Sequence, residues 1–168
     1  MLVFLDTEFT DFSDSQLISI GLVSEDGQHE LYLEVQDFDR AICNSFVQAE
    51  VWRHLGLLPN AITREADIQT RLRAWFATLP RSVTLACDSQ HDRDLLADTF
   101  EGEWPVNFVG WLDLRPMIDS GIFDKAVAAY HSKDSPWHHA LYDARAHRAG
   151  WLAWMDANKT WKRCSTGA

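Results

Sequence analysis

Residues 2–35 read LVFLDTEFTDFSDSQLISIGLVSEDGQHELYLEV and contain three segments rich in Val, Ile, Leu and Phe. These segments are residues 2–9, 17–24 and 29–35. Asp26-Gly27, which separates the second segment from the third, is a strong signal for a tight hairpin turn. The stretch therefore predicts three consecutive strands that pair as an antiparallel meander.

The rest of the chain alternates between helical and extended patterns. The first helical pattern places Ile68, Leu72, Trp75 and Phe76 at helical spacing. The expected elements are a helix over residues 65–78, a strand over 82–88, a helix over 91–100, a strand over 106–112, short helices from 115 and 123, and a long helix over 139–156. This order predicts an α/β fold with a mixed five-stranded sheet, an antiparallel three-stranded meander followed by parallel strands, flanked by helices.

Composition limits the class of protein. The chain has 168 residues, of which 46% are hydrophobic and 24% charged, so it can bury a core and is not disordered or collagen-like. We expect a single domain over residues 1–168. The apolar opening has no basic segment before it and is interrupted by Asp6 and Glu8, which favours a cytoplasmic protein with no membrane partner. Cys43, Cys87 and Cys164 have no CxxC spacing and are expected to be free thiols.

The net charge of −10 argues against a protein that holds nucleic acid through a broadly basic surface. It does not argue against a metal enzyme, because divalent cations can neutralise clustered carboxylates. Residues 144–168 carry five basic residues and one acidic residue. This basic end is either a solvated helix terminus or a surface that contacts phosphate or another subunit.

Asp6 and Glu8 lie two residues apart on the first expected strand. Residues at this spacing point to the same face of a strand, so both carboxylates converge on one spot. Two neighbouring carboxylates on an otherwise apolar strand repel each other, and a cation would relieve that repulsion. The alternative is a strand end that emerges into solvent.

Two further groups of polar residues follow downstream. Ser135-Pro136 signals a helix start, which places His138 at the beginning of the helix and Asp143 inside it. This pair suits a general base and a metal ligand. Two other interpretations remain: His139, Asp143 and His147 share a helical face, which could bind zinc or be a polar surface stripe.

The last group follows the strand over residues 82–88, where Asp88 and Asp92 flank the start of a helix. A carboxylate at a helix N-terminus is stabilised by the helix dipole, so capping alone explains it.

In sequence order, Asp6 with Glu8 (DxE), Asp92, and His138 with Asp143 (H-x4-D) resemble the motifs of DEDDh-type 3′→5′ exonucleases of the ribonuclease H-like superfamily. The chain is similar in length to the small bacterial exoribonucleases of the RNase AS type, and shares with them the DTEF start, an LISIGLVSEDG-like second strand and an HxALxDAR-like third motif. Many relatives have Asn followed by Phe-Asp in the second motif, where this chain has Asp88 and His91-Asp92. The choice between Asp88 and Asp92 therefore stays open, and we prefer Asp92.

The resemblance implies a ribonuclease H-like fold and two-metal phosphodiester hydrolysis. Two Mg²⁺ ions, or Mn²⁺ in their place, would be held by Asp6, Glu8, Asp92 and Asp143, with Asp6 bridging both. His138 would be the general base. The resemblance also implies a single-stranded RNA 3′ end as substrate, nucleoside 5′-monophosphates as products, a preference for adenylate-rich RNA, and a homodimer.

Three residues are candidates for contact with the substrate. Phe9 and Thr10 directly follow the DxE pair, and Trp137 precedes His138. An aromatic ring can stack on any base, although core packing explains Phe9 equally well. The alternatives to an exoribonuclease are a DNA or mixed-substrate exonuclease, a nucleotide phosphohydrolase, and an inactive nucleic-acid-binding module.

Overall fold

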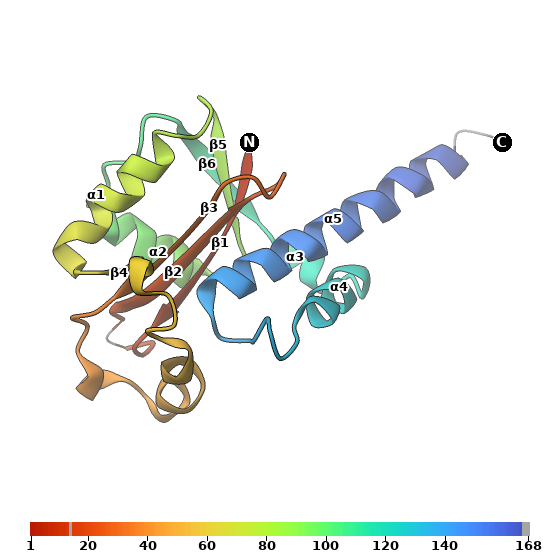
Figure 1. Ribbon diagram of the computed structural model, residues 1–168. Helices are drawn as coiled ribbons and strands as arrows, with labels where there is room; N and C mark the ends of the chain where they lie inside the picture. The colour runs from red at the N-terminus through yellow and green to blue at the C-terminus, as the bar shows by residue number, and fades with distance from the viewer. Residues whose placement is uncertain (14, 166–168) are drawn as a thin grey trace.

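The computed structural model of the chain describes residues 1–13 and 15–165, with side chains described through Lys159. At its centre is a six-stranded mixed sheet in the order β4-β3-β2-β1-β5-β6 (Figure 1). The strands are β1 (Leu2–Phe9), β2 (Leu17–Ser24), β3 (Glu30–Val35), β4 (Ile62–Thr63), β5 (Val83–Cys87) and β6 (Phe108–Asp113). The predicted antiparallel meander of β1, β2 and β3 is confirmed, and β5 and β6 continue the sheet in parallel to β1.

The predicted number of strands is wrong by one. β4 pairs in parallel with the end of β3 through two residues only, Ile62 and Thr63. A strand this short shows no alternation of apolar and polar residues, so no sequence pattern could reveal it. The segment before it was not predicted either and contains four short helical turns, Arg40–Ile42, Val47–Val51, Trp52–His54 and Pro59–Ala61.

The helices follow the expected order. They are α1 (Glu65–Phe76), α2 (Gln90–Thr99), α3 (Arg115–Ile118), α4 (Ile122–Tyr130) and α5 (Ala140–Ser165). α5 continues past the expected end at Asp156, and its C-terminal half extends beyond the sheet (Figure 1). Within the described residues, no helix is both long and apolar enough to cross a membrane.

Two apolar layers cover the two faces of the sheet, with α1 and α5 on opposite sides (Figure 1). Val3 and Leu5 of β1 belong to the layer that contains α1, whereas Phe4 packs in the layer that contains α4 and α5. Successive side chains of a strand point to opposite faces. Asp6 and Glu8 therefore share the face of Phe4 and lie on the side of the sheet that α5 covers.

Cys43 and Cys87 are buried free thiols, as the sequence predicts. The side chain of Cys164 lies outside the described residues.

Candidate metal centre

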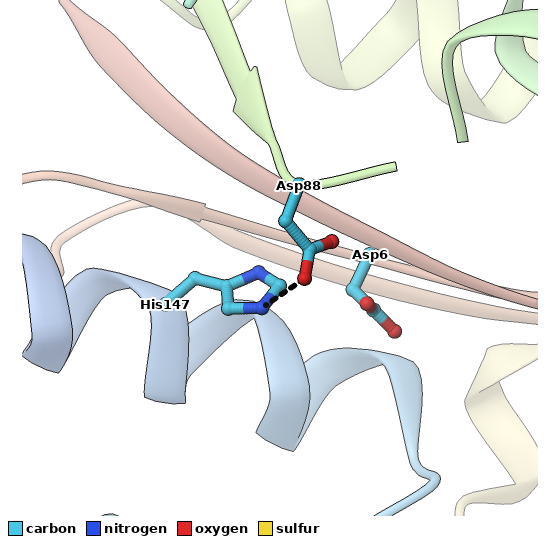
Figure 2. A group of neighbouring side chains, drawn as sticks. All are labelled: Asp6, Asp88 and His147. Atoms are coloured by element: carbon cyan, nitrogen blue, oxygen red, sulfur yellow. Dashed lines mark ion pairs between the residues drawn. The ribbon is translucent and has the colours of Figure 1, made fainter. Parts of the chain in front are cut away.

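Two groups of potential metal ligands meet at Asp6. One group consists of Asp6, Glu8 and Asp143, and the other of Asp6, Asp88 and His147. Within each group the ligand atoms lie within 4.8 Å of one another. The first group offers only carboxylate oxygens, whereas the second adds one imidazole nitrogen (Figure 2). Three parts of the fold contribute: β1, the residue directly after β5, and the first turns of α5.

The sheet brings the start of α5 against β1 through a glycine. Gly21 of β2 pairs directly with Asp6. A Cβ atom at Gly21 would lie 2.3 Å from backbone atoms of Ala140, so only glycine permits this approach. Further along β1, the pairing of β1 with β2 shifts register between Glu8 and Phe9. Such an irregularity re-aims the side chains next to it.

Asp143 is held in place by one hydrogen bond and lies beside a buried histidine. Its Oδ2 accepts a hydrogen bond from the backbone N–H of His139 at 2.9 Å, which satisfies a free donor at the start of α5. Its Oδ1 lies 3.3 Å from Nε2 of His131. The prediction that the helix orients Asp143 is therefore confirmed.

His131 is a part of the site that the sequence analysis missed. Its ring is buried and stacks on Trp137 with 3.6 Å between centroids. Its Nδ1 hydrogen-bonds the carbonyl of Ser135 at 3.1 Å, and because a carbonyl only accepts, Nδ1 carries the proton. Nε2 is left facing Asp143. His131 directly follows α4 and belongs to no motif, so only the fold reveals its role.

Asp88 and Asp92 occupy different places. Asp88 belongs to the second ligand group, and its Oδ2 lies 3.4 Å from Nε2 of His147. Asp92 belongs to neither group and is 2% exposed. Its Oδ1 accepts a hydrogen bond from Oγ1 of Thr7 at 2.6 Å, while its Oδ2 has no hydrogen-bond partner among the described residues. The geometry thus makes Asp88 a candidate ligand, and ligation by Asp92 stays a prediction.

Four carboxylates in and beside the two ligand groups, those of Asp6, Glu8, Asp92 and Asp143, hold protons more tightly than usual. Burial, together with the charges of Asp143 and Asp92, raises the pKa of Glu8 to about 8. Burial is also the main reason that the pKa of Asp92 rises to about 7 and that of Asp143 to about 6. The pKa of Asp6 is raised well above its ordinary value, first by burial and then by its carboxylate neighbours. Crowded buried carboxylates of this kind fit divalent cations, which would replace the protons.

His138 occupies a strained position beside the site. Its φ of 62° is unusual for a residue other than glycine, and such strain is concentrated at functional sites. Its imidazole packs edge-to-face on Phe46 with 4.8 Å between centroids, and its pKa is lowered, mainly by burial. The histidines that contact the site carboxylates are His131 and His147. The role of His138 as general base therefore stays a prediction.

The three predicted substrate contacts differ in exposure. Phe9 stacks on His91 with 5.4 Å between centroids, and Phe12, which is 70% exposed, packs edge-to-face on both rings. Trp137 is 48% exposed. Thr10 is fully buried, and its Oγ1 accepts a hydrogen bond from the backbone of Gln16. Phe9 and Trp137 remain available to a substrate, whereas Thr10 belongs to a turn.

The interpretation of α5 as carrying a polar surface stripe is wrong for two of its three members. His139 and His147 are both buried. His139 stacks on Tyr32 with 4.3 Å between centroids and belongs to neither ligand group. Because Asp143 and His147 fall into different groups, the described residues do not form the three-residue zinc site either.

Two basic residues of α5 bind within the chain. Arg145 pairs with Glu30 of β3, and Nε of Arg148 donates to the carbonyl of Glu25 at 2.8 Å. These contacts join α5 to the β2–β3 hairpin, so we do not propose that either arginine binds phosphate.

Comparison of the sequence with models of known protein families and with curated proteins found no match. The fold and the site by themselves define an α/β protein with a partly buried cluster of carboxylates and a histidine, close enough together to hold divalent cations.

Proposed function

We propose that the chain is a divalent-cation-dependent 3′→5′ exoribonuclease of the DEDDh type with a ribonuclease H-like fold. The observation that carries the proposal is the position of Asp6, which belongs to two ligand groups at once. A carboxylate between two cation positions is what two-metal phosphodiester hydrolysis requires. The order of the motifs along the chain, from Asp6 to Asp143, adds independent support.

Asp6, Glu8 and Asp143 would hold one cation. Asp6 would hold the other together with Asp88 or Asp92, which lie near the end of β5. Bound cations supply two things, a water of lowered pKa and positive charge that offsets the phosphate. His138 takes the proton from the attacking water, since its imidazole is partly exposed and its lowered pKa keeps it neutral and ready to accept. The backbone N–H of His139 holds the Asp143 carboxylate in a fixed orientation.

The substrate in this proposal is the 3′ end of single-stranded RNA. Trp137, which is exposed, and Phe9, which is half-buried, offer aromatic surface on which terminal bases can stack. A protein with a net charge of −10 is expected to bind a short stretch of RNA near the cations and to lack a long basic groove. A preference for adenylate-rich RNA and a homodimer complete the proposal and rest on the family resemblance.

The direction of cleavage tests the proposal. With Mg²⁺, a 3′-labelled oligoribonucleotide should release labelled nucleoside 5′-monophosphate at once, and a 5′-labelled one should shorten stepwise. The same reactions with EDTA are the control. Internal cleavage, hydrolysis of free nucleotides alone, or RNA binding without cleavage would each replace this proposal with another function.

The type of nucleic acid is tested with matched substrates. Oligo(A), oligo(U) and oligo(dA) are degraded under one salt and one metal condition. Faster degradation of oligo(A) than of oligo(dA) is expected if a contact to the 2′-hydroxyl selects RNA. Equal rates would remove the RNA assignment, and faster loss of oligo(U) than of oligo(A) would remove the adenylate preference.

A further inference from the structure

We propose that Asp6, Asp88 and His147 form a second cation position whose imidazole ligand makes it select Mn²⁺ over Mg²⁺, beside an all-oxygen position formed by Asp6, Glu8 and Asp143. This second position adds detail to the proposed function. It rests on that function in one respect, namely that both cation positions belong to the same site. It replaces the set of four carboxylates with a mixed set, in which Asp88 and His147 take part.

The geometry places three ligand atoms around one point. Figure 2 shows the imidazole of His147 on α5 and the carboxylate of Asp88 after β5 pointing toward each other beside Asp6 of β1. The three ligand atoms lie within 4.8 Å of one another, and Nε2 of His147 is 3.4 Å from Oδ2 of Asp88. His147 is 8% exposed and lies on a helix that packs on the sheet, so its ring is held in position before any ion binds.

A second observation also points to a cation. Asp92 is 2% exposed, and its Oδ2 has no hydrogen-bond partner in the described part of the chain, although Thr7 binds its other oxygen. The charge of Asp92 acts on both Asp6 and His147, so it lies close to this group. A buried carboxylate oxygen without a donor is costly. A cation nearby would offset that cost.

The donor set decides the metal. Mg²⁺ prefers oxygen ligands and octahedral geometry, whereas imidazole suits first-row transition ions. Glu8 and Asp143 complete an all-oxygen position that Mg²⁺ can fill. His147 adds a nitrogen to the other position, which favours Mn²⁺. The competing arrangement is an ion pair between protonated His147 and Asp88 that excludes a cation.

Binding of Mn²⁺ is measured by the EPR signal of the free ion, with Mg²⁺ in large excess. The wild-type protein should retain one Mn²⁺ that Mg²⁺ does not displace. His147→Gln, which offers an amide in place of the imidazole, should weaken this Mn²⁺ at least about 10-fold, and Asp88→Asn should do the same. His29→Gln changes a histidine between β2 and β3, outside the group, and should retain the ion.

Pulsed EPR of the Mn²⁺-loaded wild-type protein gives a direct test that needs no variant to fold. Coupling of Mn²⁺ to a histidine nitrogen is expected. Absence of that coupling, or unchanged Mn²⁺ affinity in folded His147→Gln, overturns the proposal. Nuclease assays on the same samples distinguish the two proposals, because an inactive protein that binds Mn²⁺ through His147 would refute only the exoribonuclease assignment.

Discussion

Asp6 is the residue on which the site depends, since both ligand groups include it. Its carboxylate lies among four others, those of Glu8, Asp88, Asp92 and Asp143, and each of them raises its pKa. Such crowding costs folding free energy in the absence of a cation. Replacing a residue that binds metal and also destabilises the metal-free protein should lower the activity and raise the stability of the metal-free protein.

Asp6→Asn should therefore lower turnover of RNA by at least about 10³-fold and raise the melting temperature of the metal-free protein. Activity is measured with saturating Mg²⁺, and melting in EDTA. Asp119→Asn changes an exposed aspartate outside the cluster and should alter neither quantity. Near-normal turnover of Asp6→Asn would contradict the metal assignment.

His138 makes a different prediction because it has no role in binding metal. Turnover at saturating Mg²⁺ should rise with pH and reach a plateau, with its midpoint below the ordinary histidine pKa, since burial lowers the pKa of His138. His138→Ala should abolish this rise and lower turnover by at least about 10²-fold, with unchanged metal affinity. His139→Ala should be much milder. If His131→Ala removes the pH dependence and His138→Ala does not, His131 is the base.

At the scale of elements, the site exists because α5 begins directly against the middle strands of the sheet. Gly21 allows the approach, and Arg145 and Arg148 fasten the helix to the hairpin that follows. The first turn of α5 then carries Asp143, and a turn later His147 faces Asp88. The position of α5 on the sheet therefore determines the geometry of both ligand groups.

Gly21→Ala should force α5 away from the sheet and destabilise the protein by about 3 kcal/mol. The added Cβ would meet the Ala140 backbone at 2.3 Å, which no side-chain movement can relieve. Gly102→Ala is the matched control, because its Cβ would meet nothing within 4 Å and only the positive φ of 75° is unfavourable. It should cost about 1 kcal/mol. Equal losses in urea denaturation would contradict the close approach.

The same elements explain what the sequence could predict. The meander, the parallel strands and the helices were predictable because apolar periodicity records them over many residues. Asp6, Glu8 and Asp143 were found because a strand or a helix orients each of them. His131 and the pairing of Asp88 with His147 were not found, because they arise where segments distant in sequence meet. β4 was missed because two residues carry no periodic signal.

For the whole molecule, the cluster links stability to pH and to metal. Glu8, Asp92 and Asp143 have pKa values of about 8, 7 and 6 in the folded protein, against about 4 in an unfolded chain. At a pH between about 4 and its folded-state pKa, each of these carboxyl groups holds a proton in the folded protein that it has released in the unfolded chain. Raising the pH removes these protons, so stability falls as pH rises toward 8. The raised pKa of His147 acts in the same direction.

The metal-free protein should therefore melt at least about 5 °C lower at pH 8 than at pH 6.5. Below pH 6.5 the buried His139, whose pKa is lowered to about 4, opposes the trend, because the unfolded chain then gains a proton that the folded protein does not bind. In the window from pH 6.5 to 8 this opposing contribution is small, and the carboxylates act together with His147. Thermal unfolding followed by circular dichroism in EDTA measures the effect.

Mg²⁺ or Mn²⁺ should restore the melting temperature at pH 8 more than at pH 6.5, because protons compete with the cation for the same oxygens. Asp6→Asn should flatten the pH dependence of the metal-free protein, since the remaining carboxylates lose a charged neighbour. A melting temperature that stays constant or rises from pH 6.5 to 8 in EDTA would mean that these carboxylates are already ionised and stabilised by the protein itself. The cluster would then need no cation, and the two ligand positions built around Asp6 would lose their physical basis.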